Sequence, residues 1–271
     1  MKNQTIPKHG VAVLGVPSDE SSSYMRGPLL GPQRIRETLH CGSANLTTES
    51  GHDLGADDRW QHVGDLELTH GEAARDQITA GIAAYLAQDV RVLTLGGDHA
   101  ITYPIIRAYA EKYPDLTIIQ FDAHGDLYDE LDGNRYSHAC PFARIMEAGL
   151  AKRLIQIGIR AMTPFQWEQV ERFGVEVHEA WNVDGMQLKL DGPVYISLDL
   201  DCLDPAYAPG VSHHEPGGLT SRQLLQMIKT LPTDQIVGAD VVELNPHRDL
   251  VNMTAMVGAK CVKELLDKML N

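Results

Sequence analysis

Short apolar runs alternate with amphipathic segments along nearly the whole chain. Apolar runs bounded by Gly, Pro or Asp are typical of buried strands, and the sequence predicts them at 11–17, 89–95, 116–121, 154–159, 194–198 and 236–243, with shorter ones at 62–66 and 175–177. Between them, residues such as Ile78, Ile82 and Leu86 recur at helical spacing. Helices are predicted at 33–39, 71–87, 103–112, 141–148, 164–173, 220–229 and 255–270.

This order of elements predicts the fold class. Strands that alternate with helices are typical of a mostly parallel sheet with helices on both faces, so we expect an α/β fold. Polar segments at 18–32, 41–62, 127–137 and 205–218 are predicted to be loops. No composition break, repeat or low-complexity tract marks a linker, and we expect residues 1–271 to form a single domain.

Candidate metal ligands follow the strand predicted at 116–121. Asp122, His124 and Asp126 come directly after it, at alternate positions. Alternate residues of an extended backbone point the same way, so the three side chains converge if the backbone stays extended. Carboxylate oxygens and imidazole nitrogens suit a divalent ion such as Mn²⁺.

The same arrangement occurs after two further predicted strands. His99 follows the run 89–95, and Asp199 and Asp201 follow the run 194–198. In parallel α/β sheets, ligands bind just beyond the carboxyl ends of the strands. The sequence therefore predicts one metal site that these three strand ends build together.

Composition and charge limit the classes of partner that we expect for this chain. The chain is 43% hydrophobic and carries a formal net charge of −14, which disfavours nucleic acid and anionic membranes. No apolar stretch is long enough to span a membrane. The four cysteines lie far apart, which argues against a disulfide framework or a structural zinc site, and Cys202 is expected to be a small buried residue. The N-terminus resembles neither a signal nor a transit peptide, so a cytoplasmic location is expected.

Three motifs together resemble the signatures of the ureohydrolases, the family of arginase and agmatinase. They are Gly96-Gly97-Asp98-His99, Asp122-Ala123-His124-Gly125-Asp126 and Ser197-Leu198-Asp199-Leu200-Asp201-Cys202-Leu203-Asp204-Pro205. The segments 133–147, 209–219 and 238–246 are similar to plant-type arginases in particular. The resemblance extends from about Val11 to Leu266.

The resemblance implies a three-layer α/β/α fold and two Mn²⁺ ions per subunit. One ion would be held by His99, Asp122, Asp126 and Asp199, and the other by Asp122, His124, Asp199 and Asp201. It also implies a small guanidino substrate and a homo-oligomer, a trimer or hexamer.

Further positions are carried over from the family. His138 matches the proton shuttle and Glu243 the carboxylate that binds the guanidinium. Asn134 and Ser137 lie where contact with the far end of the substrate is implied. Asp126 is expected to be required for metal loading and turnover together.

Several alternatives remain open at this stage. L-Arginine is the first choice of substrate, with agmatine next, then 4-guanidinobutyrate or guanidine. A single-zinc hydrolase of the deacetylase type and a non-catalytic relative are the competing classes. His213 and His214 are expected to stabilise their loop, although contact with substrate is the alternative, and Asp204 is expected to stabilise a turn.

Overall fold

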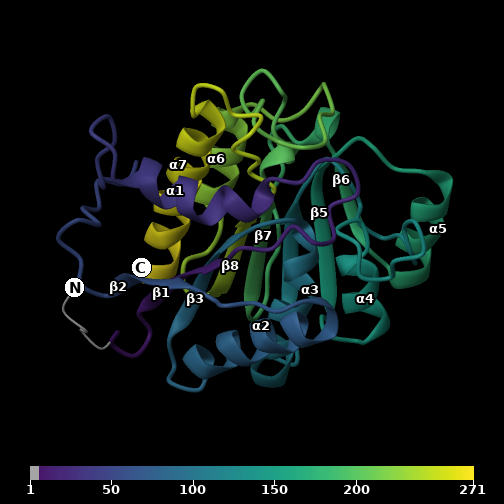
Figure 1. Cartoon of the computed structure of the whole chain (residues 1–271), viewed down its shortest axis with the longest axis horizontal. Helices are drawn as coiled ribbons and strands as arrows, with labels where there is room; N and C mark the ends of the chain where they lie inside the picture. Colours follow the sequence, from purple (N-terminus) through teal and green to yellow (C-terminus); the bar gives the residue numbers. More distant parts are fainter. Residues whose placement is uncertain (1–5) are drawn as a thin grey trace.

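A computed structural model describes residues 6–271 (Figure 1). The strands are β1 (Val11–Val16), β2 (Trp60–Asp65), β3 (Arg91–Gly96), β4 (Thr117–Phe121), β5 (Arg153–Ile159), β6 (Glu176–Glu179), β7 (Val194–Asp199) and β8 (Ile236–Val242). The α-helices are α1 (Gly31–Leu39), α2 (Gly71–Leu86), α3 (Thr102–Lys112), α4 (Pro141–Glu147), α5 (Pro164–Phe173), α6 (Ser221–Thr230) and α7 (Met253–Leu270). Short 3-10 turns η2 (His99–Ile101) and η4 (Leu200–Cys202) follow β3 and β7.

The strands form one sheet in the order β2-β1-β3-β8-β7-β4-β5-β6. Every neighbouring pair is parallel. Helices α1, α6 and α7 cover one face, and α2, α3 and α4 cover the other (Figure 1). The predicted three-layer α/β/α fold is confirmed, and the sheet is parallel throughout rather than mostly so.

Burial explains why the strong strands read as continuous apolar runs. Every residue of β1, β4, β7 and β8 is buried, because helices cover both faces of the sheet. One apolar core lies under α1, α6 and α7, and a second lies under α2, α3 and α4. The edge strands β2 and β6 are only partly buried, which is why their sequences carry a weaker signal.

The start of β2 differs from the prediction. The sequence predicts a loop through residue 62, but β2 begins at Trp60 because Trp60 and Gln61 pair with Val11 and Ala12 of β1. The indole of Trp60 is buried and its Nε1 donates to the carbonyl of Leu54 at 2.8 Å. Pairing with β1, which is far away in the chain, decides where β2 begins, so the local sequence alone does not predict this boundary.

Residues 1–5, where the absence of a targeting peptide was predicted, lie outside the described residues. Within residues 6–271, no helix combines the length and apolar character that crossing a membrane requires.

Candidate metal centre and active site

The carboxyl ends of four adjacent central strands build the site. β3 leads to His99, β8 to Glu243, β7 ends in Asp199, and β4 leads to Asp122. These strands are neighbours in the sheet but far apart in the chain, so the topology brings their ends to one edge. This is the position at which parallel α/β sheets place their ligands.

The backbone after β4 does not stay extended, so the stated reason for convergence in the Asp122–Asp126 motif is wrong. β4 ends at Phe121, the amide of His124 donates to Oδ1 of Asp122 at 2.6 Å, and Asp126 has a φ of 50°. A Cβ on Gly125 would lie 2.2 Å from Sδ of Met162, so a larger residue here would have to displace the Met162 side chain. The side chains nevertheless converge, because the turn curls them around one point.

His99 shows which of its atoms faces the carboxylates. Its Nε2 lies 2.9 Å from Oγ of Ser197, and that hydroxyl donates to Oδ1 of Asp240 at 2.8 Å. Ser197 therefore accepts from Nε2–H of His99. The other nitrogen, Nδ1, lies 3.1 Å from a carboxylate oxygen of Asp122 and 3.2 Å from one of Asp126 and one of Asp199.

This arrangement fits a metal ion. Among residues 6–271, Nδ1 of His99 is buried without a hydrogen bond of good geometry, although three carboxylates surround it. A nitrogen lone pair that faces carboxylates is repelled by them unless a proton or a metal ion lies between, and, although burial opposes it, the carboxylates raise the pKa of His99 well above its usual range for the same reason. Two groups offer ligand atoms within 4.8 Å of one another, His99 with Asp122 and Asp199, and Asp122 with His124 and Asp201. They share Asp122, so the residues present can hold adjacent ions.

The electrostatics of the cluster also demand positive charge. Burial raises the pKa of Asp126 to about 6, and the negative charge of Asp122 adds to this effect. Burial, with the charges of Asp201 and Asp122, raises the pKa of Asp199 well above its usual range. Burial opposes charge on His124, but the carboxylates, Asp201 foremost, raise its pKa. Divalent ions at this point would relieve the repulsion among the carboxylates.

His138 and Glu243 form a pair beside the carboxylate cluster. Nδ1 of His138 lies 3.2 Å from Oε1 of Glu243, which also accepts from the backbone amide of His99 at 2.9 Å. Burial opposes the charge on His138, but Glu243 outweighs it and raises the pKa of His138 to about 9. The same contact lowers the pKa of Glu243 against its own burial. The pair is therefore an ion pair at neutral pH.

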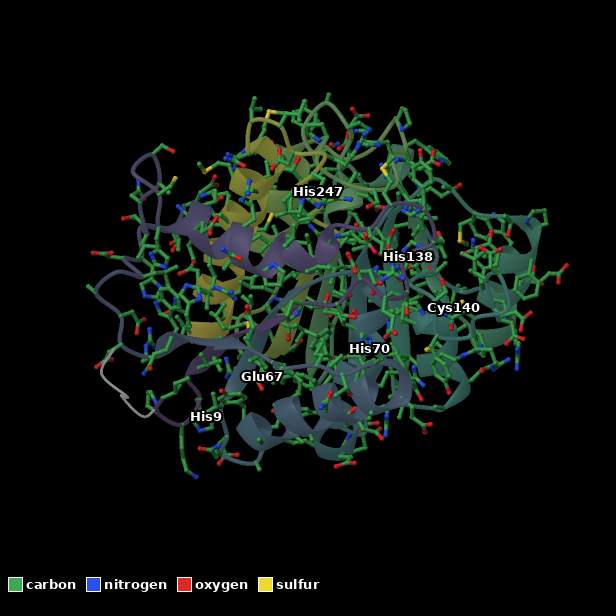
Figure 2. The ribbon with its side chains drawn as sticks, in the orientation of Figure 1. His9, Glu67, His70, His138, Cys140 and His247 are labelled. Carbon is green, nitrogen blue, oxygen red and sulfur yellow. The ribbon has the colours of Figure 1, made fainter. Side chains whose placement is uncertain are left out.

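The loop after β1 closes one side of the site. It runs from β1 to α1, purple in Figure 1, and Figure 2 shows His138 beside it. Ser23 of this loop places its Oγ 2.9 Å from Nε2 of His138. Asp98 holds the loop, because its Oδ2 accepts from the amide of Ser21 at 2.9 Å and from the hydroxyl of Ser22 at 3.3 Å. Burial and the charge of Glu243 raise the pKa of Asp98 to about 7.

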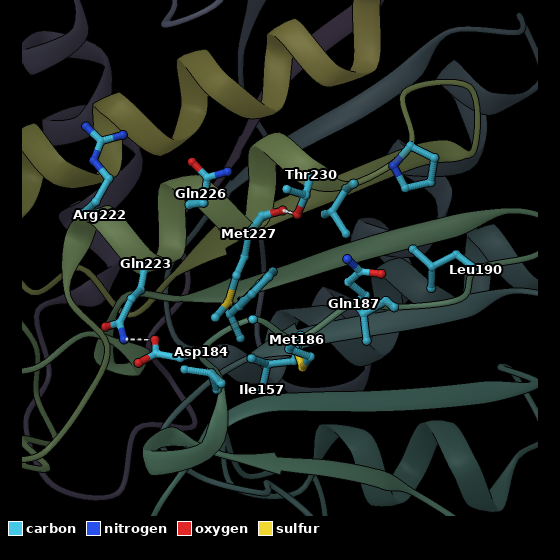
Figure 3. A pocket seen from close by; sticks show the side chains of 16 residues that line it. Ile157, Asp184, Met186, Gln187, Leu190, Arg222, Gln223, Gln226, Met227 and Thr230 are labelled. Carbon is cyan, nitrogen blue, oxygen red and sulfur yellow. Dashed lines mark hydrogen bonds between the residues drawn. The ribbon is translucent and has the colours of Figure 1, made fainter.

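A cavity of about 470 Å³ opens onto these residues. The residues that line it include Asp126, Asp199, Asp201, His124 and Glu243, together with Ser23, Tyr128, Leu131, Met162, Thr163 and Gln166. A larger cavity of about 690 Å³ lies between α6 and the segment 183–190 (Figure 3). No histidine lines that cavity, and its Asp184 accepts a hydrogen bond from Gln223 at 2.8 Å, so the smaller cavity carries the chemistry.

The two predicted contacts to the far end of the substrate do not line the cavity. Asn134 uses its Oδ1 to accept from the amide of Tyr136 at 2.9 Å, and Ser137 is buried. Their contact with substrate stays a prediction.

His213 and His214 have different surroundings. His213 lines the cavity, and its ring centroid is 4.9 Å from that of His138 and 6.2 Å from that of His124. His214 points its Nε2 at the carbonyl of Pro209 at 2.7 Å, which is the expected loop contact. The prediction is thus confirmed for His214, whereas His213 belongs to the cavity wall.

Two smaller predictions hold. Cys202 is fully buried in the apolar core. Asp204 stabilises its turn, because its carboxylate accepts from the amides of Ala206 at 2.9 Å and Gly217 at 2.7 Å.

The sequence did not predict a set of buried polar residues in the strands that hydrogen-bond to the candidate ligands and hold them in place. Ser197 hydrogen-bonds to Nε2 of His99, and Asp240 accepts a hydrogen bond from Ser197. Gln120 donates to Oδ2 of Asp122 at 2.7 Å. Gln156 connects Gln120 to the carbonyl of Gly125. Their one signal in the sequence is a polar residue inside an otherwise apolar strand, since each is fully buried in β4, β5, β7 or β8. A buried polar side chain needs a partner, and here the partner is the site.

Residues 9–267 match the sequence model of the Arginase family. The chain belongs to this family. The prediction of a ureohydrolase-type enzyme, made from the three motifs, is therefore confirmed.

Individual proteins that resemble the chain support the family assignment. A rice (Oryza sativa) arginase is 45% identical over 279 residues, which cover 96% of this chain and 82% of the relative. An agmatinase of Bacillus cereus is 35% identical over 264 residues, with 94% and 90% covered. The structure of an arginase from Medicago truncatula superposes with a TM-score of 0.89 at 44% identity and covers 96% of this chain and 87% of that one.

The relatives contradict the predicted cytoplasmic location of this arginase-family chain. The rice protein is named a mitochondrial arginase, as are relatives of similar identity from Arabidopsis thaliana and Medicago truncatula. The prediction rested on the N-terminal residues and the scattered cysteines, and the names of these relatives show that it was wrong.

Proposed function

We propose that the protein hydrolyses L-arginine to L-ornithine and urea with two Mn²⁺ ions bound at the strand ends. The observation that carries the proposal is the pair of ligand groups sharing Asp122, directly under a cavity that also contains His138 and Glu243. His99, Asp122, Asp126 and Asp199 would hold one ion, and Asp122, His124, Asp199 and Asp201 the other. When bound, such ions supply hydroxide at neutral pH.

Glu243 is suited to bind the guanidinium. Both of its hydrogen bonds among residues 6–271 use Oε1, so Oε2 is left to accept from a substrate N–H. A carboxylate paired with a guanidinium fixes direction as well as charge. Glu243 raises the pKa of the neighbouring His138, which supports this role because the same carboxylate already stabilises a cation.

His138 is suited to donate the proton that the reaction needs. Hydroxide adds to the guanidinium carbon, and the bond from that carbon to the substituted nitrogen then breaks. The departing nitrogen must take up a proton to leave as a neutral amine. His138, with a pKa of about 9 beside Glu243, carries a proton at neutral pH and can give it from Nε2, the nitrogen that faces Ser23.

Substrate choice depends on the outer cavity. The relatives of highest identity named above are arginases, which supports arginine. Among the described residues, neither lysine nor arginine lines the cavity, so apart from His138 an α-carboxylate would have only neutral donors such as Ser23, Thr163 and Gln166. That observation favours agmatine, which lacks the carboxylate, as the second candidate.

Urea release tests the proposal directly. Mn²⁺-loaded protein is assayed with arginine, agmatine, 4-guanidinobutyrate and guanidine at equal concentration, and bound metal is counted per chain. Preference for arginine with two metals bound is the expected result. Preference for agmatine would overturn the substrate and keep the metal chemistry, whereas one zinc per chain would favour the deacetylase-type alternative.

Asp126 tests the link between metal and turnover. Asp126→Ala removes one of the carboxylates at 3.2 Å from Nδ1 of His99. We expect metal loading and urea release to be lost together, and undiminished urea release would refute the assignment.

The single-domain organisation, the homo-oligomer and the substrate contacts of Asn134 and Ser137 also belong to this proposal. Sedimentation measures the oligomeric state.

A further inference from the structure

Two imidazoles face each other at the edge of the sheet, away from the active site. His40 caps the carboxyl end of α1, and His62 lies on the edge strand β2. Their Nε2 atoms are 3.1 Å apart and their ring planes meet at 73°. We propose that His40 and His62 form a second metal site, which binds a borderline divalent ion such as Zn²⁺. This site is independent of the proposed function.

The distance between the nitrogens fits two ligands of one ion. Imidazole nitrogens lie about 2.0–2.1 Å from Zn²⁺, so two of them in a tetrahedral site are about 3.3 Å apart. A hydrogen bond between neutral imidazoles gives a similar separation, and it is the alternative that the experiment must exclude. Nδ1 of His62 is buried without a partner among residues 6–271, so Nε2 is the nitrogen that an ion from solvent can reach.

The surroundings keep His62 neutral and in place. Burial, with the charges of His40 and Arg36, lowers the pKa of His62 to about 4, so its imidazole carries no proton that would compete with a metal. The guanidinium of Arg36 is paired with Asp65 of β2 at 2.8 Å, which balances its charge. Trp60 packs edge-on against His62 at 5.2 Å between centroids and limits the movement of the ring.

The remaining coordination positions would be filled by water. His40 is exposed, so one side of the pair opens to solvent. Among residues 6–271, no third histidine, cysteine or carboxylate completes a close group with the pair. Two imidazoles with water suit Zn²⁺ or Cu²⁺, whereas Mn²⁺ and Mg²⁺ prefer carboxylates. The bound ion would join the end of α1 to β2.

Zinc binding to the Mn²⁺-loaded protein tests the proposal. Isothermal titration with Zn²⁺ is expected to show one zinc per chain bound at the pair, in addition to zinc that displaces Mn²⁺ from the active site, where N/O ligands bind Zn²⁺ more tightly than Mn²⁺. His40→Ala should weaken this binding at least about tenfold, because even partners that only orient a ligand are worth that much. His70→Ala is the matched control, since its side chain is 90% exposed and lies on another element. It should bind zinc as the unaltered protein does.

Two further measurements keep the test decisive if a variant folds poorly. Anomalous diffraction at the zinc edge, from crystals of the Mn²⁺-loaded protein soaked in Zn²⁺, should show a peak within about 2.1 Å of both Nε2 atoms. Zinc should also raise the melting temperature of the unaltered protein and not that of His40→Ala. No peak at the pair, or equal zinc affinity in His40→Ala, would overturn the proposal and leave a hydrogen bond between neutral imidazoles.

Discussion

At the scale of single residues, the hydrogen bonds of His99 decide which of its nitrogens faces the carboxylates. Nε2 is occupied by Ser197, whose hydroxyl donates to Asp240, and Asp240 is in turn fixed by hydroxyl donors from Tyr195 at 2.8 Å and Thr102 at 3.0 Å. Such a chain fixes both the tautomer and the ring orientation of a ligand. If His99 binds the proposed metal, we expect the affinity to depend on these residues, which touch no metal themselves.

Ser197→Ala tests this dependence. The substitution leaves the N–H of His99 without an acceptor and removes one donor from Asp240, so Mn²⁺ affinity should fall by about 10- to 100-fold. Metal content after dialysis against graded free Mn²⁺ measures the change. Ser212→Ala, another buried serine, is the control and should keep its affinity. Equal affinity in Ser197→Ala would mean that packing alone orients His99.

Glu243→Gln separates substrate binding from metal binding. The glutamine keeps the shape but loses the charge that pairs with a guanidinium, so kcat/KM should fall by about 100-fold or more. Metal content should stay unchanged, because no Glu243 atom belongs to the two ligand groups. Steady-state urea release and metal analysis on the same sample measure both effects. Loss of metal together with activity would instead give Glu243 a structural role.

At the scale of elements, the carboxyl end of α7 is tied to the segment 49–59 by a polar cluster. Asp57 accepts from Arg59 at 2.6 Å and contacts His52 at 2.9 Å, while His52 also contacts Asp267 of α7 at 2.9 Å. Arg59 donates to the carbonyl of Leu270 at 2.7 Å, which satisfies one of the last free carbonyls of the helix. Asp57 is the centre of this connection.

Asp57→Asn should destabilise the fold in a pH-dependent way. Hydrogen bonds from Arg59 lower the pKa of Asp57 to about 2, so the charged form stabilises the folded state above the unfolded pKa near 3.8. The variant should lose about 1–2 kcal/mol at pH 7, and the deficit should shrink as the pH falls below about 5 towards 2. Urea unfolding at several pH values measures this. Asp58→Asn, at an exposed neighbouring residue, is the control and should change the free energy of unfolding little. If the stability loss of Asp57→Asn is the same at every pH, the ion pair is not its cause.

At the scale of the whole molecule, the site gathers negative charge at the centre of the sheet edge. Asp122, Asp126, Asp199 and Asp201 are all buried there, in a chain whose net charge is already −14. Without divalent ions their repulsion opposes folding, and ions that bind only the folded state add stability by mass action.

Metal removal should therefore lower the melting temperature. Chelation of the loaded protein is expected to lower it by several degrees, and returning Mn²⁺ should restore it. Asp126→Ala is the control, because it should already melt like the chelated protein and respond little to either treatment. A melting temperature that chelation leaves unchanged would contradict a metal centre that is coupled to folding.

The sequence by itself determined the alternation of strands and helices, and with it the parallel sheet. It did so because apolar runs such as 116–121 are buried on both faces and therefore carry a strong local signal. It also identified the candidate metal ligands, since carboxylates and imidazoles right after predicted strands lie where such sheets bind ligands.

The tertiary structure alone decided what depends on neighbours far apart in the chain. The order β3-β8-β7-β4 brings His99, Glu243, Asp199 and Asp122 together, and no local pattern encodes that order. The left-handed turn at Asp126, the place of His213 in the cavity wall and the pairing of His40 with His62 have the same origin. Side-chain direction follows from backbone turns and packing partners, which only the folded chain supplies.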